Sequence, residues 1–280
     1  MSAPTLTMTS DSGPVGGRLP GADIRVTQAR VFRSEWLKLI TLPSSWYTFF
    51  AAAAAMIGID LLVCWAMNSH WSQMGPMERL TFDPIGHSLR ATFMAQLIIG
   101  VLGVLFISGE YGTGMIRSTL GAVPRRLPVL WAKLSVFVAA TFVVAMVAAF
   151  ASFFGGQALL GVHGTTLSAP GALRSVFGAA LYLCVVSIFS MGIGFAIRNT
   201  AGGIATVFGL LLILPGLVQA LPHSWEQHIF PYLPSVAGSG IYVVKADPGT
   251  LAPWTGFGVF CIWAVAAVIA GAWVLVRRDA

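Results

Sequence analysis

Six stretches of apolar residues constrain this 280-residue chain more than any other feature. They cover residues 45–67, 90–108, 131–158, 173–197, 202–221 and 253–276. About 20 mostly apolar residues cross the hydrocarbon core of a bilayer, and backbone in lipid must satisfy its hydrogen bonds internally. Alternating ten-residue barrel strands are not seen. The sequence therefore predicts an all-α membrane protein, with six transmembrane helices in a domain over residues 43–280.

Composition supports lipid as the solvent. The chain is 56% hydrophobic and only 9% charged, whereas soluble domains carry roughly a quarter charged residues. The three cysteines, Cys64, Cys184 and Cys261, all fall inside apolar stretches, which indicates buried thiols rather than a disulfide framework or a metal site. The five histidines lack an accompanying cluster of cysteines or carboxylates, so no metal site is predicted.

The first 42 residues change character at about Asp23. Residues 1–22 are rich in Ser, Thr, Gly and Pro, and we expect a disordered N-terminal tail there. Over 23–42, apolar residues recur at helical spacing opposite a cationic face, which is typical of an amphipathic helix lying in the membrane interface. The alternative is the first turns of an ordinary membrane span. The apolar face comprises Ala29, Phe32, Trp36, Leu39 and Ile40, and the polar face comprises Arg30, Arg33, Ser34 and Lys38.

The positions of the basic residues predict the orientation, because Lys and Arg collect on the cytoplasmic side of membrane proteins. With six spans both termini share one side, and twelve of the 16 basic residues would lie there. We therefore expect a multi-pass protein of the cytoplasmic membrane with both termini inside, and no nucleic-acid partner. The twelve are Arg18, Arg25, Arg30, Arg33, Lys38, Arg117, Arg125, Arg126, Lys133, Arg198, Arg277 and Arg278.

The outer connections differ in character. Residues 68–89 are expected to form a polar loop, and residues 159–172 a short Gly-rich loop. Residues 222–252 are aromatic, semi-apolar and interrupted by prolines, which favours short helices that dip into the outer interface before the last span. Within the spans, Gly192 and Ala196 have the spacing of close helix packing, more typical here of contact within one subunit than of a dimer face. Pro215-Gly216 predicts a kink in the fifth span.

The inner connection 109–133 is the most charged and the most Gly/Pro-punctuated of the inner side. Its glycines permit sharp turns at the end of the second span. A short helix from about Met115 to Val123, ended by Pro124, is expected to follow. Such a segment suits docking to a soluble partner, whereas composition alone favours a loop that anchors lipid headgroups.

Two motifs resemble ABC-2-type transporter permeases. The first is Glu110-Tyr111-Gly112-Thr113-Gly114-Met115-Ile116-Arg117, followed by Leu120, Pro124, Arg126 and Ala132-Lys133. It departs from the family pattern in that Thr113 precedes Gly114 and Met115 stands where Thr is common. The second is Arg33-Ser34-Glu35-Trp36-Leu37-Lys38-Leu39, which resembles the segment that precedes the first span in that family. The six-span layout extends the resemblance over nearly the whole chain.

The resemblance implies a permease subunit that pairs with a second permease and with two cytoplasmic ATPase subunits. It also implies short re-entrant outer helices and a cytoplasmic coupling helix that docks on the ATPase. On this reading the ATPase-coupling residues are Glu110, Tyr111, Arg117, Arg125, Arg126 and Lys133, and the interfacial helix contributes Arg30, Arg33, Glu35, Trp36 and Lys38. For Arg125, Arg126 and Lys133 the alternative is attraction to lipid headgroups.

The chain itself contains no GxxxxGK[ST] sequence for cradling phosphates. We therefore expect no catalytic residues and no cofactor on this chain, with ATP and Mg²⁺ bound by the partner subunit. Asp60 is the only charged residue well inside an apolar stretch. It belongs either to a substrate pathway or to a structural pair with Arg90 or a neighbouring helix.

The leading hypothesis is an ABC exporter permease. A self-contained secondary transporter would show repeated halves and paired intramembrane charges, which are not seen. A membrane-embedded enzyme would need a nucleophile and base, or paired acids, at membrane depth. The sequence does not name the substrate, and it leaves both the direction of transport and the choice between homodimer and heterodimer open.

Overall fold

A computed structural model describes residues 27–41, 43–115, 126–245 and 249–277. It is helical, and the described residues include no strand. Six helical segments are long and apolar enough to cross a membrane, which confirms the predicted all-α class and the number of spans. They are Trp46–Ser69, Pro84–Gly112, Arg126–His163, Ala172–Ile197, Thr200–Gln219 and Pro253–Arg277.

The long helices follow the chain in order. They are α2 (Pro43–Ser69), α5 (Thr92–Gly112), α7 (Arg126–Leu160), α8 (Ala172–Ile197) and α13 (Pro253–Arg277). The fifth span is built from α9 (Thr200–Phe208), a π-helical turn η3 (Gly209–Ile213) and α10 (Leu214–Gln219). A separate helix, α1 (Gln28–Thr41), precedes them. The short segments are η1 (Trp71–Gln73), α3 (Pro76–Thr81), α4 (Pro84–His87), η2 (Gly161–His163), α11 (His223–Ile229), η4 (Phe230–Tyr232) and α12 (Pro234–Ser239).

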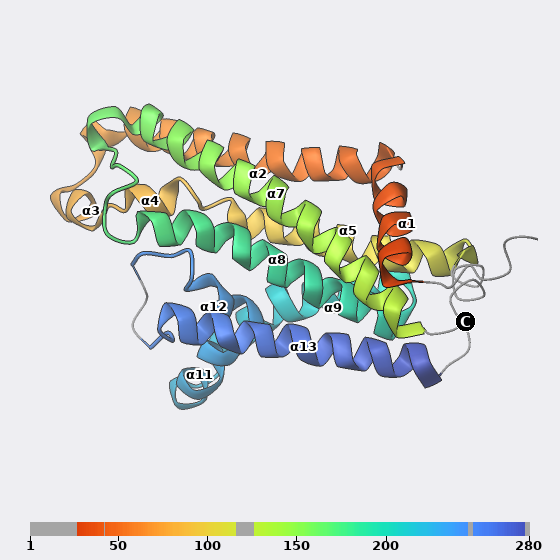
Figure 1. Cartoon of the computed structure of the whole chain (residues 1–280). Helices are drawn as coiled ribbons and strands as arrows, with labels where there is room; N and C mark the ends of the chain where they lie inside the picture. Colours follow the sequence, from red (N-terminus) through yellow and green to blue (C-terminus); the bar gives the residue numbers. More distant parts are fainter. Residues whose placement is uncertain (1–26, 42, 116–125, 246–248, 278–280) are drawn as a thin grey trace, which may run out of the picture.

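The spans form a bundle around α8, which packs against α5, α7, α9 and α13 (Figure 1). Helix α1 stands across one end of this bundle, next to the start of α2. We call this end the α1 end; the last turn of α5, the first turn of α7 and the last turn of α13 also lie there. Helices α3, α4 and α11 lie toward the other end, which we call the α3 end.

Two connections at the α3 end contain short helices. Residues 68–89 were expected to form a polar loop, and the structure adds three short helices that were not predicted, η1, α3 and α4. Local capping explains this: the Glu78 carboxylate accepts the Gly75 N–H at the start of α3, and the Asp83 carboxylate accepts the Ile85 N–H at the start of α4. The short helices predicted over 222–252 are confirmed by α11, η4 and α12.

Close packing of α8 against α13 depends on glycine. A Cβ on Gly192 would lie 2.6 Å from the carbonyl carbon of Ala267, and one on Gly271 would lie 2.8 Å from the carbonyl oxygen of Gly192. The two backbones therefore approach as closely as small residues allow. This confirms that Gly192 packs within the subunit.

The fifth span is distorted before Pro215. Proline has no N–H to donate, and its ring crowds the carbonyl four residues earlier, which is that of Leu211. The π-helical turn Gly209–Ile213 surrounds that position and lets the helix continue. The irregularity expected at Pro215-Gly216 therefore extends over the preceding turn.

Candidate functional site

Helix α1 packs a single stripe of residues against the bundle. Its buried residues are Val31, Glu35 and Leu39, at i, i+4 and i+8. Phe32 and Trp36, predicted on the apolar face of an interfacial helix, are exposed to the surroundings of the chain. An exposed aromatic stripe beside exposed arginines fits a helix at a membrane interface. The polar residue in the buried stripe is Glu35.

Glu35 enters a cluster of four charged side chains contributed by three helices. The Lys133 ammonium of α7 lies 2.7 Å from Glu35 Oε2 and 2.6 Å from Glu110 Oε1 of α5. Lys38 Nζ lies 2.7 Å from Glu35 Oε1 and 3.4 Å from the same Glu110 oxygen. Lys133 also lies 5.2 Å from the centre of the Phe106 ring, within the range of a cation–π contact. We call Glu35, Lys38, Glu110 and Lys133 the ion cluster.

The ion cluster is buried and balanced in charge. Lys133 is only 1% exposed, and both carboxylates are buried. Taking ions out of water costs several kcal/mol each unless opposite charges and hydrogen bonds compensate, and here two carboxylates meet two ammonium groups. Burial lowers the pKa of Lys38, but the hydrogen bonds and charges of Glu35 and Glu110 outweigh it and raise that pKa above its ordinary value. Lys38 is therefore charged at neutral pH.

The position of the ion cluster along the chain connects it to the inner connection. Glu110 lies in the last turn of α5 and Lys133 in the second turn of α7, so their ion pair joins the two helices at the base of the segment between them. A hydrogen bond of 3.1 Å from Gln28 to the Pro128 carbonyl adds a second tie between α1 and α7. A force on this connection would therefore act on α1, α5 and α7 together.

Arg198 and Arg126 connect the end of α13 to neighbouring helices. The Arg198 guanidinium lies 5.1 Å from the centre of the Tyr111 ring and donates to the Val274 carbonyl of α13 at 2.8 Å. Arg126 donates to the Leu275 carbonyl at 2.9 Å. Cations near the last carbonyls of a helix are stabilising. Both arginines thus bind the end of α13 to the α1 end of the bundle.

The structure distributes the predicted coupling residues unevenly. Glu110 and Lys133 are brought together and buried, so neither presents its charge on the surface, and Lys133 does not reach lipid headgroups. Arg126 contacts α13. Arg117 and Arg125 lie outside the described residues. A coupling role remains a prediction for all of them, and for Glu110 and Lys133 it would act through their contacts with α1.

The residues predicted for the interfacial helix differ in how exposed they are. Arg30, Arg33 and Trp36 are exposed, whereas Glu35 is buried and Lys38 is half-buried beside it. The sequence contains the signal for this division, because Val31, Glu35 and Leu39 follow the i, i+4 spacing of a single stripe. A carboxylate within a stripe of apolar residues indicates a buried cation opposite it.

Asp60 is buried within the second helix and contacts backbone. Its Oδ1 accepts the Ala91 N–H at 2.7 Å, at the start of α5, and Oδ2 has no hydrogen bond among the described residues. The carboxylate thus satisfies an N–H at the α4–α5 junction rather than pairing with Arg90. This geometry matches the neighbouring-helix alternative, and a role for Asp60 in a substrate pathway remains a prediction.

The thiols lie in the bundle. Cys64 and Cys184 are buried and Cys261 is half-buried, each as a free cysteine. Among the described residues, no three His, Cys, Asp or Glu side chains come together in a group that could hold a metal ion.

Comparison with known families identifies the chain. A family model described as an ABC-2 family transporter protein matches residues 31–216, well over half of the chain. A search of curated proteins found no match. The matched range begins in α1 and includes all four residues of the ion cluster. The chain, with its six membrane-spanning helices, belongs to the ABC-2 family of transporter proteins.

Proposed function

We propose that the chain is the permease subunit of an ABC exporter in the cytoplasmic membrane. A separate ATPase subunit would supply ATP hydrolysis, and a second permease would complete the membrane pathway. Substrate would pass between the two permeases. The observation that carries this proposal is the ion cluster, because it ties the base of the inner connection to the interfacial helix.

The distribution of charge supports a cytoplasmic α1 end. Most of the basic residues that the structure describes belong to segments at this end of the bundle, namely Arg30, Arg33, Lys38, Arg126, Lys133, Arg198 and Arg277. Among the described residues the α3 end has fewer, namely Arg79, Arg90, Arg174 and Lys245, and its acids Glu78, Asp83 and Glu226 offset them. By the positive-inside rule, both termini would then face the cytoplasm, where the ATPase resides.

The ion cluster suits a mechanical role in coupling. Loops and helices that move in transport must be tied to rigid elements if a push at one place is to shift the spans. The Glu110–Lys133 pair joins the two helices that flank the inner connection, and Glu35 adds α1 to the same unit. A partner that presses on residues 113–125 would thereby move α5, α7 and α1 as one body.

Affinity purification tests the partnership. A tagged chain, extracted from its own membrane in mild detergent, should co-elute with a protein that carries a phosphate-binding GxxxxGK[ST] loop. Reconstituted together, the two should hydrolyse ATP faster than the ATPase alone. Arg117→Ala should reduce this stimulation while the chain still inserts. Arg277→Ala, a cation in the last turn of α13, is the matched control.

Two outcomes would contradict the proposal. One is purified chain that moves solute across proteoliposomes under an ion gradient with no ATPase present, since that is the behaviour of a secondary transporter. The other is unchanged ATPase stimulation in both Arg117→Ala and Glu110→Ala, since then neither the inner connection nor its base takes part in coupling.

A further inference from the structure

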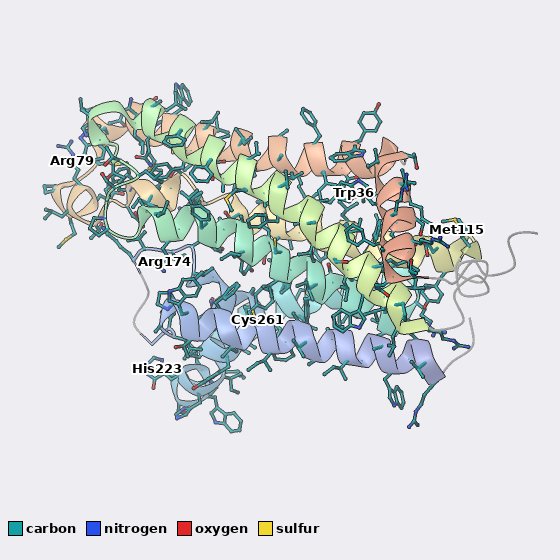
Figure 2. All side chains as sticks on the ribbon, viewed as in Figure 1. Trp36, Arg79, Met115, Arg174, His223 and Cys261 are labelled. Atoms are coloured by element: carbon teal, nitrogen blue, oxygen red, sulfur yellow. The ribbon has the colours of Figure 1, made fainter. Side chains whose placement is uncertain are left out.

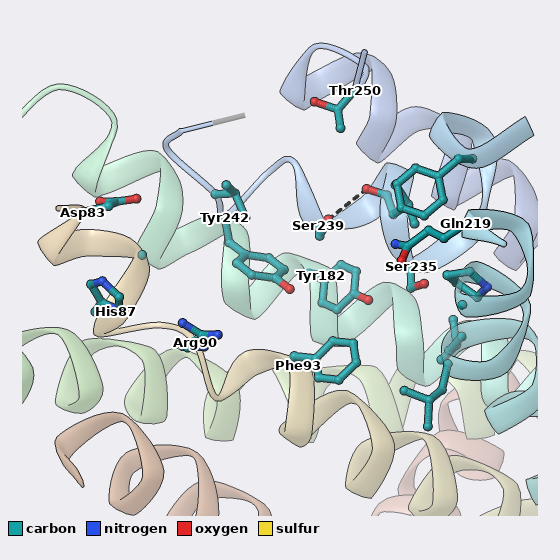
Figure 3. A pocket seen from close by; sticks show the side chains of 18 residues that line it. Asp83, His87, Arg90, Phe93, Tyr182, Gln219, Ser235, Ser239, Tyr242 and Thr250 are labelled. Carbon is teal, nitrogen blue, oxygen red and sulfur yellow. Dashed lines mark hydrogen bonds between the residues drawn. The ribbon is translucent and has the colours of Figure 1, made fainter. Parts of the chain in front are cut away.

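A cavity of about 710 Å³ opens toward the α3 end, away from the ion cluster. Its wall comes from the α4–α5 junction, the middle of α8, the distorted fifth span and the segment around α12. Figure 3 shows Tyr182 and Tyr242 between Arg90 and Phe93 on one side and Ser239 and Thr250 on the other. The two tyrosine rings meet edge to face at 5.2 Å.

Much of the cavity wall is apolar. Phe93 contributes from α5, and the fifth span contributes Leu211, Leu212 and Pro215. Leu211 and Leu212 belong to the π-helical turn, an irregularity that occurs frequently at functional sites. Sites for small molecules are typically apolar with a few placed polar groups. The apolar part would accept a hydrocarbon body.

Two hydroxyls of the wall have no hydrogen bond within the described part of the chain, whereas the Ser239 hydroxyl donates to the Val236 carbonyl. These hydroxyls belong to Tyr242, which is 8% exposed, and Ser235, which is 7% exposed. Neither oxygen is a fully buried atom, so both hydroxyls are accessible from the cavity and can donate to a ligand there. Tyr182 differs, because its hydroxyl donates to Gln96 Oε1 and only its ring is available.

Arg90 provides charge at the same wall. Its guanidinium forms no ion pair or hydrogen bond within the described part of the chain, although five N–H groups are available to donate. Asp83 is the acid among the lining residues, and its carboxylate accepts the Ile85 N–H at the start of α4. Burial raises the pKa of the Tyr242 hydroxyl, with a smaller contribution from Asp60, so Tyr242 keeps its proton and can donate.

We propose that this cavity binds an amphipathic anion. The carboxylate or phosphate of the ligand accepts from Arg90 and Tyr242, which Figure 3 shows on the same side of Tyr182, and its hydrocarbon lies against the π-helical turn. A cationic ligand would face the guanidinium, and a purely apolar one would leave the hydroxyls unpaired. The inference names the substrate class of the proposed permease and so rests on that function, but binding is measured without an ATPase.

The test uses the whole chain in nanodiscs of phosphatidylcholine, with 11-(dansylamino)undecanoic acid as the probe and its methyl ester as the uncharged match. Dansyl emission excited through the protein's tryptophans, corrected with empty nanodiscs, should saturate for the acid. Saturation should need at least about tenfold more of the ester, since a hydrogen bond to a charged group is lost.

Variants of the residues that line the cavity test where the anion binds. Arg90→Gln should weaken binding of the acid by about tenfold or more, Arg90→Lys should restore part of it, and Tyr242→Phe should weaken it while the ring stays. Arg79→Gln is the control, because Arg79 donates to the Trp71 and Ser72 carbonyls and does not line the cavity. Monodisperse elution of each variant shows that it folds.

The origin of the anion is decided by adding phosphatidylglycerol to the nanodiscs. Displacement of the acid by this lipid in the unaltered chain supports the proposal with a membrane phospholipid as occupant. Persistent binding supports it with a free amphiphile as occupant. Equal affinity for acid and ester, or affinity unchanged in Arg90→Gln, would overturn it. Failure of ATPase stimulation leaves these measurements unaffected and would count against the proposed function alone.

Discussion

At the scale of single residues, Lys133 has the most consequential position. It is the one residue of the ion cluster that contacts both carboxylates at under 3 Å, and it connects α7 to α1 and to α5. Lys133→Met keeps most of the side chain's volume but leaves Glu35 and Glu110 with only the half-buried Lys38. Removing one partner of a buried ion pair costs about 3–5 kcal/mol. We expect a loss of thermal stability of that order in detergent.

A double variant separates this cost from lost packing. Glu35→Gln with Lys133→Met removes one charge of each sign and leaves Lys38 beside Glu110. The double variant should be more stable than Lys133→Met alone, because fewer unpaired charges stay buried. Thermal denaturation of the two single variants and the double variant measures the coupling. Additive losses would show that the ion pair contributes nothing beyond shape.

At the scale of elements, the sequence predicts the spans, whereas it does not predict which residues of α1 pack against the bundle. Long apolar stretches determine span position because lipid tolerates little else. The predicted apolar face of α1 divides between two surroundings, because Leu39 packs against the bundle whereas Phe32 and Trp36 stay exposed. Glu35, which the pattern placed on neither face, is buried beside Leu39. An interfacial helix has two apolar environments, the bundle and the lipid, and hydrophobicity does not distinguish them.

The candidate sites show the same limit. Glu110 and Lys133 were identified from their motif, but their mutual contact spans 23 residues and depends on how α5 and α7 pack. The cavity lining combines Arg90, Tyr182 and Tyr242 from three distant segments, so no local spacing could indicate it. The short helices in 68–89 were missed although their caps, Gly75 with Glu78 and Asp83, are visible in the sequence.

The contact between α8 and α13 allows a matched prediction for one substitution at two glycines. A Cβ on Gly192 of α8 would lie 2.6 Å from the backbone of Ala267 in α13. A Cβ on Gly258 of α13 would meet nothing within 4 Å. Gly192→Ala should therefore destabilise the protein by about 1–3 kcal/mol through overpacking. Gly258→Ala should be neutral or slightly stabilising, because alanine favours helix. Thermal denaturation of both checks this, and equal stability would contradict the close approach.

At the scale of the whole molecule, the two ends of the bundle have different chemistry. The α1 end contains the ion cluster and the two arginines that contact the end of α13. Figure 2 shows Trp36 and Met115 at this end. The α3 end contains the short helices and the amphipathic cavity. Figure 2 shows Arg79, Arg174 and His223 toward this end. Force would enter at one end and ligand would bind near the other, with α5 contributing to both sites.

This division depends on one orientation in the membrane, which cysteine labelling determines. In a background where Cys64, Cys184 and Cys261 are alanine, Val162→Cys and Thr113→Cys each place a thiol at an exposed position, Val162 being 93% exposed. Val162 lies beyond α7 at the α3 end, and Thr113 lies beyond α5 at the α1 end. A membrane-impermeant maleimide should label Val162→Cys in intact cells and Thr113→Cys only after permeabilisation, because the cationic end stays inside. The reverse pattern would put the ion cluster outside, beyond the reach of any cytoplasmic ATPase, and the coupling proposal would fail with it.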